Sequence, residues 1–329
     1  MNILDKEEYK FLETDERLGK RIILLGYGGS YAYGTNIETS DVDIRGVCLR
    51  STENILLGKD FEVVTNNLID TAIYTFDKML NLLSECNPNC IEILGLRKQD
   101  YFIITDIGQE LLDNKDLFVS KKCINTFGGY ATQQLYRLRQ KTLDALTPEE
   151  YRDHIIKTIN GMKEHLENSW HIPIDRVDII STDEGLKINL KEINNISLDD
   201  YYGLQNEISN VIRTYYKNST RNKKAMEHNK INKHAMHLLR LYMMAIDLLK
   251  SGEIITYRTE EHDLLMDIRN GKYSNEDGMM NKDFWNLLSE YEVKFDEAKK
   301  ISKLPDNPDY DGIDKFRFKV NEFIVDNNL

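Results

Sequence analysis

The 329-residue sequence has little of what marks linker-rich or membrane-bound proteins. It contains only five prolines and no low-complexity tract, which argues against long linkers. The first twenty residues lack the apolar core of a secretory signal. The longest apolar run nearby, residues 22–25, is far too short to cross a bilayer. We therefore expect a globular, cytoplasmic protein with no membrane contact.

Cysteine is scarce as well. The four cysteines, Cys48, Cys86, Cys90 and Cys123, have no zinc-binding spacing. Reduced, partly buried thiols are expected, with no disulfide-linked partner.

Basic residues are outnumbered by acidic ones. The chain has 43 Lys and Arg against 55 Asp and Glu, a net charge of −12. This balance disfavours a surface coated in positive potential for long duplexes. Residues 121–141 and 217–240 are locally basic, however, and each forms either a basic groove or an ordinary solvated surface.

The hydrophobic pattern divides the chain into an α+β part and a mainly helical part. Strands are predicted at 21–27, 41–49, 61–66, 70–75 and 101–105, with helices at 4–19 and 76–85 and a short helix from residue 90. Later helices are predicted at 121–146, 149–168, 199–218, 230–251, 259–270, 280–300 and 311–327, with a loop or small hairpin at 171–198. We place a domain boundary near residue 118.

The stretch "GYGGSYAYGTNIETSDVDIRGV", residues 26–47, combines a glycine turn with two closely spaced acids. It is not a dinucleotide fingerprint, because Tyr31 stands where the third glycine is required. It is not a P-loop either, because the sequence has no Gly-Lys-Ser/Thr.

The remaining interpretation is a site for phosphates and a metal. Asp41 and Asp43, two residues apart on a strand, are expected to share a face. Such a carboxylate pair repels itself unless a cation lies between, and Mg²⁺ suits one or two carboxylates plus phosphates. Gly28 and Gly29 allow the backbone to approach a phosphate, and Ser30 adds a hydroxyl donor.

These residues carry a resemblance to a known superfamily. "GGSYAYGT" followed by "SDVDIRGV" resembles the Gly-Ser plus Asp-x-Asp signature of the DNA polymerase β-like nucleotidyltransferases. Further patterns are similar to the bacterial and phage branch associated with RNA repair. They are residues 43–47, Asn87-Pro88-Asn89 followed by Glu92, the helix from Lys233 to Arg240, and "IRNGKY" at 268–273.

The resemblance implies a nucleotidyltransferase catalytic domain at 1–118, with a mixed sheet and flanking helices, and a helical substrate-binding domain at 119–329. It implies two Mg²⁺ ions, with Mn²⁺ as an alternative, held by Asp41 and Asp43. Ser30, Gly28 and Gly29 would bind the phosphates of an NTP. A third carboxylate is usual in this superfamily: Asp70 is our candidate and Glu62 the second choice.

Cationic side chains complete the candidate site. Arg45 points to the same face as Asp43, where it meets either a phosphate or a nearby acid. In "KINKHAMHLLRLYMMAIDLL", Lys233, His237 and Arg240 fall on one helical face, whereas His234 is rotated from it. This face either binds phosphates or is an exposed basic surface.

Three functions are therefore compared. The first is transfer of NMP from an NTP to a hydroxyl on RNA, tRNA or another nucleic-acid end. The second keeps the chemistry with another acceptor, as in nucleotide second-messenger synthases or toxin- and antitoxin-type modifiers of small molecules, proteins or tRNA. The third is a catalytically silent nucleotide-binding regulator, which the intact acid pair and Ser30 disfavour.

Overall fold

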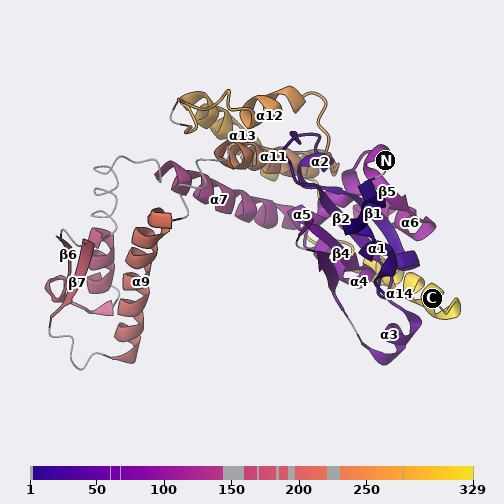
Figure 1. Ribbon diagram of the computed structural model, residues 1–329, viewed down its shortest axis with the longest axis horizontal. Coiled ribbons are helices and arrows are strands. Elements are labelled where there is room, and N and C mark those ends of the chain that lie inside the picture. Colours follow the sequence, from indigo (N-terminus) through magenta and orange to yellow (C-terminus); the bar gives the residue numbers. More distant parts are fainter. Residues whose placement is uncertain are drawn as a thin grey trace. The chain divides into compact units, whose positions relative to one another are not determined.

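A computed structural model describes residues 3–59, 61–66, 68–143, 159–168, 170–182, 185–191, 197–220, 230–276 and 278–328 (Figure 1). Two compact units are present. Unit 1 comprises Met1–Tyr136, Asn232–Ser274 and Asn281–Leu329, and unit 2 comprises Arg137–Ile231 and Asn275–Met280. These units do not follow a boundary at residue 118, because the later helices pack with the N-terminal sheet in unit 1. The division into a catalytic and a substrate-binding domain stays a prediction.

Unit 1 is built on a mixed five-stranded sheet of order β3-β4-β2-β1-β5. The strands are β1 (Ile22–Gly28), β2 (Asp43–Cys48), β3 (Val63–Asn66), β4 (Thr71–Thr75) and β5 (Tyr101–Ile104). β2 runs parallel to β4, and the other pairs are antiparallel. All five strands were predicted within one or two residues of their ends, and the α+β fold class is confirmed.

The helices of unit 1 differ in length along the chain. The early ones are short: α1 (Phe11–Thr14), α2 (Gly29–Ala32), α3 (Thr52–Leu57), α4 (Phe76–Ser84), α5 (Pro88–Ile91) and α6 (Asp106–Asp113). The later ones are mostly longer: α7 (Lys122–Leu143), α11 (Lys230–Ser251), α12 (His262–Arg269), α13 (Lys282–Ile301) and α14 (Tyr310–Asp326). The helices predicted at 230–251, 280–300 and 311–327 are confirmed, whereas α12 begins three residues after its predicted start at 259. Residues 144–158, which belong to the predicted helices 121–146 and 149–168, lie outside the described residues.

The expected single helix over residues 4–19 is wrong. The segment folds as 3₁₀ turns at Ile3–Asp5, Glu7–Tyr9 and Gly19–Arg21 around the one-turn helix α1. Asp15 accepts a hydrogen bond from the backbone N–H of Arg17 at 2.9 Å. This local turn competes with helical pairing, and Gly19 then takes a left-handed conformation (φ +60°).

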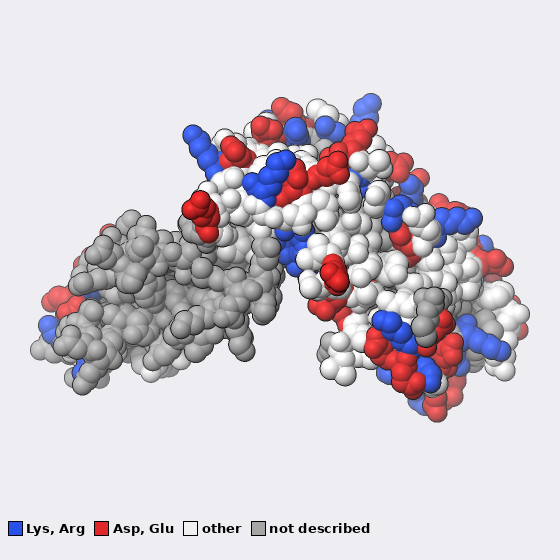
Figure 2. All heavy atoms as spheres, turned by 45° about the horizontal axis from the view of Figure 1, so that its top comes forward, with Lys and Arg blue, Asp and Glu red and all other residues white. Residues whose placement is uncertain are grey.

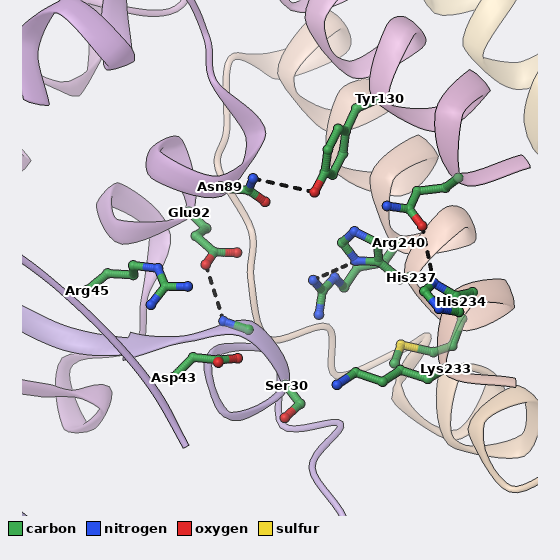
Figure 3. A pocket seen from close by; sticks show the side chains of 13 residues that line it. Ser30, Asp43, Arg45, Asn89, Glu92, Tyr130, Lys233, His234, His237 and Arg240 are labelled. Carbon is green, nitrogen blue, oxygen red and sulfur yellow. Dashed lines mark hydrogen bonds between the residues drawn. The ribbon is translucent and has the colours of Figure 1, made fainter. Parts of the chain in front are cut away.

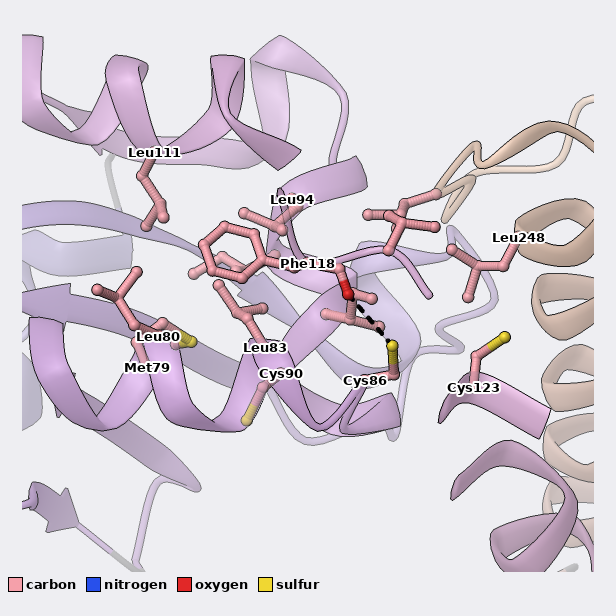
Figure 4. Close-up of a cluster of buried hydrophobic side chains, with 14 of the residues drawn as sticks. Met79, Leu80, Leu83, Cys86, Cys90, Leu94, Leu111, Phe118, Cys123 and Leu248 are labelled. Atoms are coloured by element: carbon pink, nitrogen blue, oxygen red, sulfur yellow. Dashed lines mark hydrogen bonds between the residues drawn. The ribbon is translucent and has the colours of Figure 1, made fainter. Parts of the chain in front are cut away.

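Hydrophobic clusters cover both faces of the sheet. One face packs against α4, α6, α14 and α11. Leu80, Leu111, Phe118 and Leu248 of this cluster are labelled in Figure 4. The other packs against the N-terminal segment through Tyr9 and Leu12. Burying one such side chain contributes about 1.5–3 kcal/mol, so the sheet is a firm base for the turn that follows β1.

The four cysteines are free and buried, as expected. Burial raises the pKa of Cys90 to about 11 and of Cys48 and Cys123 to about 12. The Cys86 thiol donates to the Phe118 carbonyl at 3.4 Å in the core (Figure 4). Among the described residues, no helix has the length and apolar character needed to span a bilayer.

Unit 2 contains an antiparallel hairpin, β6 (Val177–Thr182) and β7 (Gly185–Leu190), and the helix α9 (Leu198–Thr220). Residues 159–168 are also helical. A small cluster around Met162, Leu166, Val177 and Leu204 holds these elements together. For residues 171–198 the sequence left a loop or a small hairpin open, and the structure contains the hairpin.

Candidate active site

A cavity of about 210 Å³ lies in unit 1 (Figure 3). One wall, which we call the sheet wall, consists of Gly29, Ser30, Asp43 and Arg45. The opposite wall, the helix wall, consists of Lys233, His234, His237 and Arg240 on α11. Asn89 and Glu92, around the end of α5, and Tyr130 and Gln134, on α7, complete the lining. Most predicted site residues therefore meet in one place.

The glycine turn directly supports Asp43. Gly29 has φ +54°, and a Cβ built on it would overlap Oδ2 of Asp43. The carboxylate thus lies against the bare Cα, which only glycine permits. Asp43 opens β2 and pairs with Gly28 at the end of β1, so strand register places the acid beside the turn.

Asp70 lies beside Asp43 at the same end of the sheet. β2 and β4 are parallel with Ile44 opposite Thr71, so the residues just before them are neighbours. Burial and hydrogen bonding with Asp70 raise the pKa of Asp43 to about 7. Burial opposes ionisation of Asp70 too, but hydrogen bonding with Asp43 and the nearby Arg45 hold its pKa below the usual value. The two acids are therefore electrostatically coupled, and ionisation is disfavoured at Asp43 and favoured at Asp70.

Arg45 pairs with an acid, one of the two alternatives that the sequence left open. Its Nη2 lies 3.0 Å from Oδ1 of Asp70, and its Nη1 donates to the Asp70 carbonyl at 2.6 Å. The guanidinium also lines the cavity. Arg45 therefore orients Asp70, which has a positive φ of 40°.

The helix wall follows from the periodicity of α11. Lys233, His237 and Arg240 lie along one face, as predicted, while Leu238 and Met244 are buried in the core. Arg240 is itself only 6% exposed; it lies 3.5 Å from the Tyr33 ring centroid and donates to Nδ1 of His237 at 2.9 Å. An arginine cannot accept a hydrogen bond, so Nδ1 of His237 is the acceptor.

Four of the predicted residues lie outside this lining, and Asp70, the neighbour of Asp43, is one of them. Asp41 precedes β2, because the strand begins only at Asp43; it is exposed and is not among the cavity residues. Gly28 is the last residue of β1 and also lies outside the lining. Glu62 pairs with Lys78 at 2.8 Å, and its carbonyl accepts from Thr75, at the opposite end of β4 from Asp70.

Several lining residues had no chemical role in the sequence interpretation. His234 lines the cavity despite its rotation from Lys233 and contacts Gln134, with Nδ1 and Oε1 3.3 Å apart. Asn89 donates to the Tyr130 hydroxyl at 3.4 Å. Glu92 is buried against the glycine turn. The pattern Asn87-Pro88-Asn89 with Glu92 was the available signal: Asn87 caps α5, which aims Asn89 and Glu92 inward.

The locally basic segments give a mixed outcome. Lys121 pairs with Asp306 at 2.9 Å and Lys122 with Glu85 at 2.6 Å, so these two lysines are neutralised by acids. The basic side chains of residues 137–141 and 217–230 lie outside the described part. On the described surface in Figure 2, residues of both signs are intermixed.

The donor set of Asp43 and Asp70 fits a hard divalent cation. Among the described residues, no three acidic, histidine or cysteine side chains gather as a complete metal cage. Mg²⁺ does not require one, since it is bound by one or two carboxylates and completes its shell with phosphates and water. Two adjacent carboxylates offer such a pair, because a cation between them relieves their mutual repulsion.

Comparison with known proteins finds a family that resembles the N-terminal part of the chain. Residues 3–157 match the family described as RNA repair pathway DNA polymerase beta family. The match spans the sheet wall, Asp70, Asn89, Glu92 and Tyr130; the helix wall lies outside it. No curated protein and no solved structure matches the chain. The match covers slightly less than half of the 329-residue chain, and the similarity supports a polymerase β-like nucleotidyltransferase.

Proposed function

We propose that the protein is an Mg²⁺-dependent nucleotidyltransferase that transfers NMP from an NTP to a hydroxyl on an RNA or another nucleic-acid end. The observation that carries this proposal is the opposition of the two walls. Asp43 lines one side of the cavity, with Asp70 next to it on the neighbouring strand, and Lys233 and Arg240 line the other side. A metal-bound triphosphate needs carboxylates for its metal and cationic side chains for its phosphates, within a few ångströms of each other.

The reaction balances without a further reactant. The acceptor oxygen attacks the α-phosphorus, a new P–O bond forms, and the α–β phosphoanhydride bond breaks to release pyrophosphate. The hydroxyl proton leaves to solvent. Bound Mg²⁺ would lower the pKa of the attacking hydroxyl and neutralise phosphate charge. Asp43 and Asp70 would hold the metal, Ser30 would donate to a phosphate oxygen, and Lys233 and Arg240 would attract the triphosphate.

Asp41 keeps its predicted role as a metal ligand within this proposal. It is exposed and lies outside the cavity lining, two residues before Asp43. RNA is favoured as acceptor because the family description names RNA repair. The net charge of −12 acts against an extended duplex and is compatible with a single end.

The test is a labelling screen. The full chain is incubated with Mg²⁺ and each of four α-labelled NTPs, against total RNA, tRNA, single-stranded DNA and no acceptor. We expect label on RNA, loss of label with EDTA, and loss with Asp43→Asn. Soluble oligonucleotides in the arm without acceptor would instead assign the messenger-synthase class. Equal labelling by the wild type and Asp43→Asn would refute the proposed site.

A further inference from the structure

Glu92 is a buried acid in the cavity that the proposed chemistry does not use. It begins the 3₁₀ turn Glu92–Gly95 directly after α5 and is only 6% exposed. A buried carboxylate costs several kcal/mol unless polar partners compensate. Its partners therefore indicate what keeps it there.

The direct partner of Glu92 is the glycine turn. The Gly29 N–H donates to Oε1 of Glu92 at 3.2 Å, while the carboxylate of Asp43 lies against the Cα of the same glycine. Figure 3 shows Glu92 and Asp43 on either side of this backbone. The turn is thus held between two acids, one of which is the proposed metal ligand.

The surroundings of Glu92 also connect the two walls. Burial raises the pKa of Glu92, and Arg240, the Gly29 N–H, Arg45 and Tyr33 act in the opposite direction. Tyr33 is the ring on which Arg240 stacks, at 3.5 Å. Glu92 therefore binds the backbone of the sheet wall and lies in the same electrostatic surroundings as the arginine of the helix wall.

We propose that Glu92 is a positioning residue of the transfer site: it fixes the Gly29 backbone so that Asp43 is held in place to bind the metal. This inference rests on the proposed function. Because the Gly29 N–H is directed to Glu92, the contacts of the turn with phosphates fall to Ser30 and not to the Gly29 amide.

Two near-isosteric variants separate position from charge. Glu92→Gln keeps the length and an oxygen that accepts from Gly29 but removes the charge. Glu92→Asp keeps the charge but withdraws the oxygens by one methylene. Glu85→Gln, at an exposed ion pair outside the cavity, is the matched control. For each variant, kcat, KM for the NTP, the Kd of a non-hydrolysable NTP analogue and the melting temperature are measured with the full chain.

We expect Glu92→Asp to lower kcat about 10- to 100-fold, since small misplacements of a reacting group cost this much. Its analogue Kd should change less than about threefold, since the cations that attract phosphates remain. Glu92→Gln should keep kcat within about fivefold of wild type because the bond to Gly29 survives. Glu85→Gln should match wild type.

Three results would overturn the inference. Loss of kcat in Glu92→Gln with retention in Glu92→Asp would assign a charge role. A wild-type kcat in both variants would mean that Glu92 has no role in transfer. Loss in both that follows a lower melting temperature would make Glu92 merely structural. Failure of the proposed function would look different, because the wild type itself would not label RNA. The Kd of the analogue could still be compared between the variants in that case.

Discussion

The two walls of the cavity are built by different means. The sheet wall depends on backbone detail: a left-handed Gly29, the register of β1 with β2, and a positive φ at Asp70. On the helix wall, the helical period brings the cationic side chains onto one face, since residues three or four apart on α11 lie together. An acid whose position is set by the backbone is misplaced by almost any change in that backbone. A cation on a long, exposed side chain can instead change rotamer and still reach its ligand. Disruption of the sheet wall should therefore lower kcat, and disruption of the helix wall should raise KM.

The largest effect is expected from the acid pair. Asp43→Asn removes the charge that would hold the metal, and we expect kcat to fall roughly 10³-fold or more. Asp70→Asn should also lower kcat. Asp41→Asn is the informative comparison, since its residue lies outside the cavity. A larger loss for Asp41→Asn than for Asp43→Asn would contradict the arrangement described.

The second effect concerns the glycine that supports Asp43. Gly29→Ala puts a methyl group where Oδ2 of Asp43 lies, so kcat should fall about 100-fold. The left-handed backbone adds about 1–2 kcal/mol of destabilisation, measurable by urea unfolding. Gly58→Ala is the matched control, because Gly58 has a similar φ of +61° with open space around it. Gly58→Ala should lose stability and keep full activity; equal activity in the two variants would refute the support of Asp43.

A smaller effect, on KM, is expected from the helix wall. Lys233 is exposed at the cavity, and Lys233→Met should raise KM for the NTP about 5- to 10-fold with kcat nearly unchanged. The difference should shrink in high salt because exposed charges are screened. Lys272→Met, at an exposed pair with Asp267, is the control. A fall in kcat without a change in KM would show that Lys233 acts in the chemical step, as we expect of the sheet wall, and not in NTP binding.

The smallest effect tests the core beneath the sheet wall. With thiol pKa values raised to about 11–12 at Cys48, Cys90 and Cys123, the reactive thiolate is about 100-fold or more scarcer at pH 8 than at an unperturbed cysteine. A thiol reagent should therefore leave the native chain nearly unmodified and react with all four cysteines in urea. Rapid reaction of a native thiol would show that the core opens.

Local pattern was sufficient for much of the molecule. The alternation in 41–49 and the leucine-rich run 21–27 predict strands that the structure contains, and period-3.6 spacing predicts α7, α11, α13 and α14. The N-terminal helix failed because side-chain hydrogen bonds around Asp15 compete with helical pairing, and a hydrophobic pattern does not register them. The same limit applies to Asp41, whose strand starts two residues later than its alternation indicates.

The sequence by itself determined the motif, the chemistry that it indicates and the family resemblance, because these reside in residue types at short spacing. Only the tertiary structure decided which acid lies beside Asp43, since that depends on the parallel pairing of β2 with β4. It likewise decided that α11 faces the glycine turn and that Glu92 holds Gly29. Contacts between segments far apart in the chain arise from packing, which no local spacing encodes.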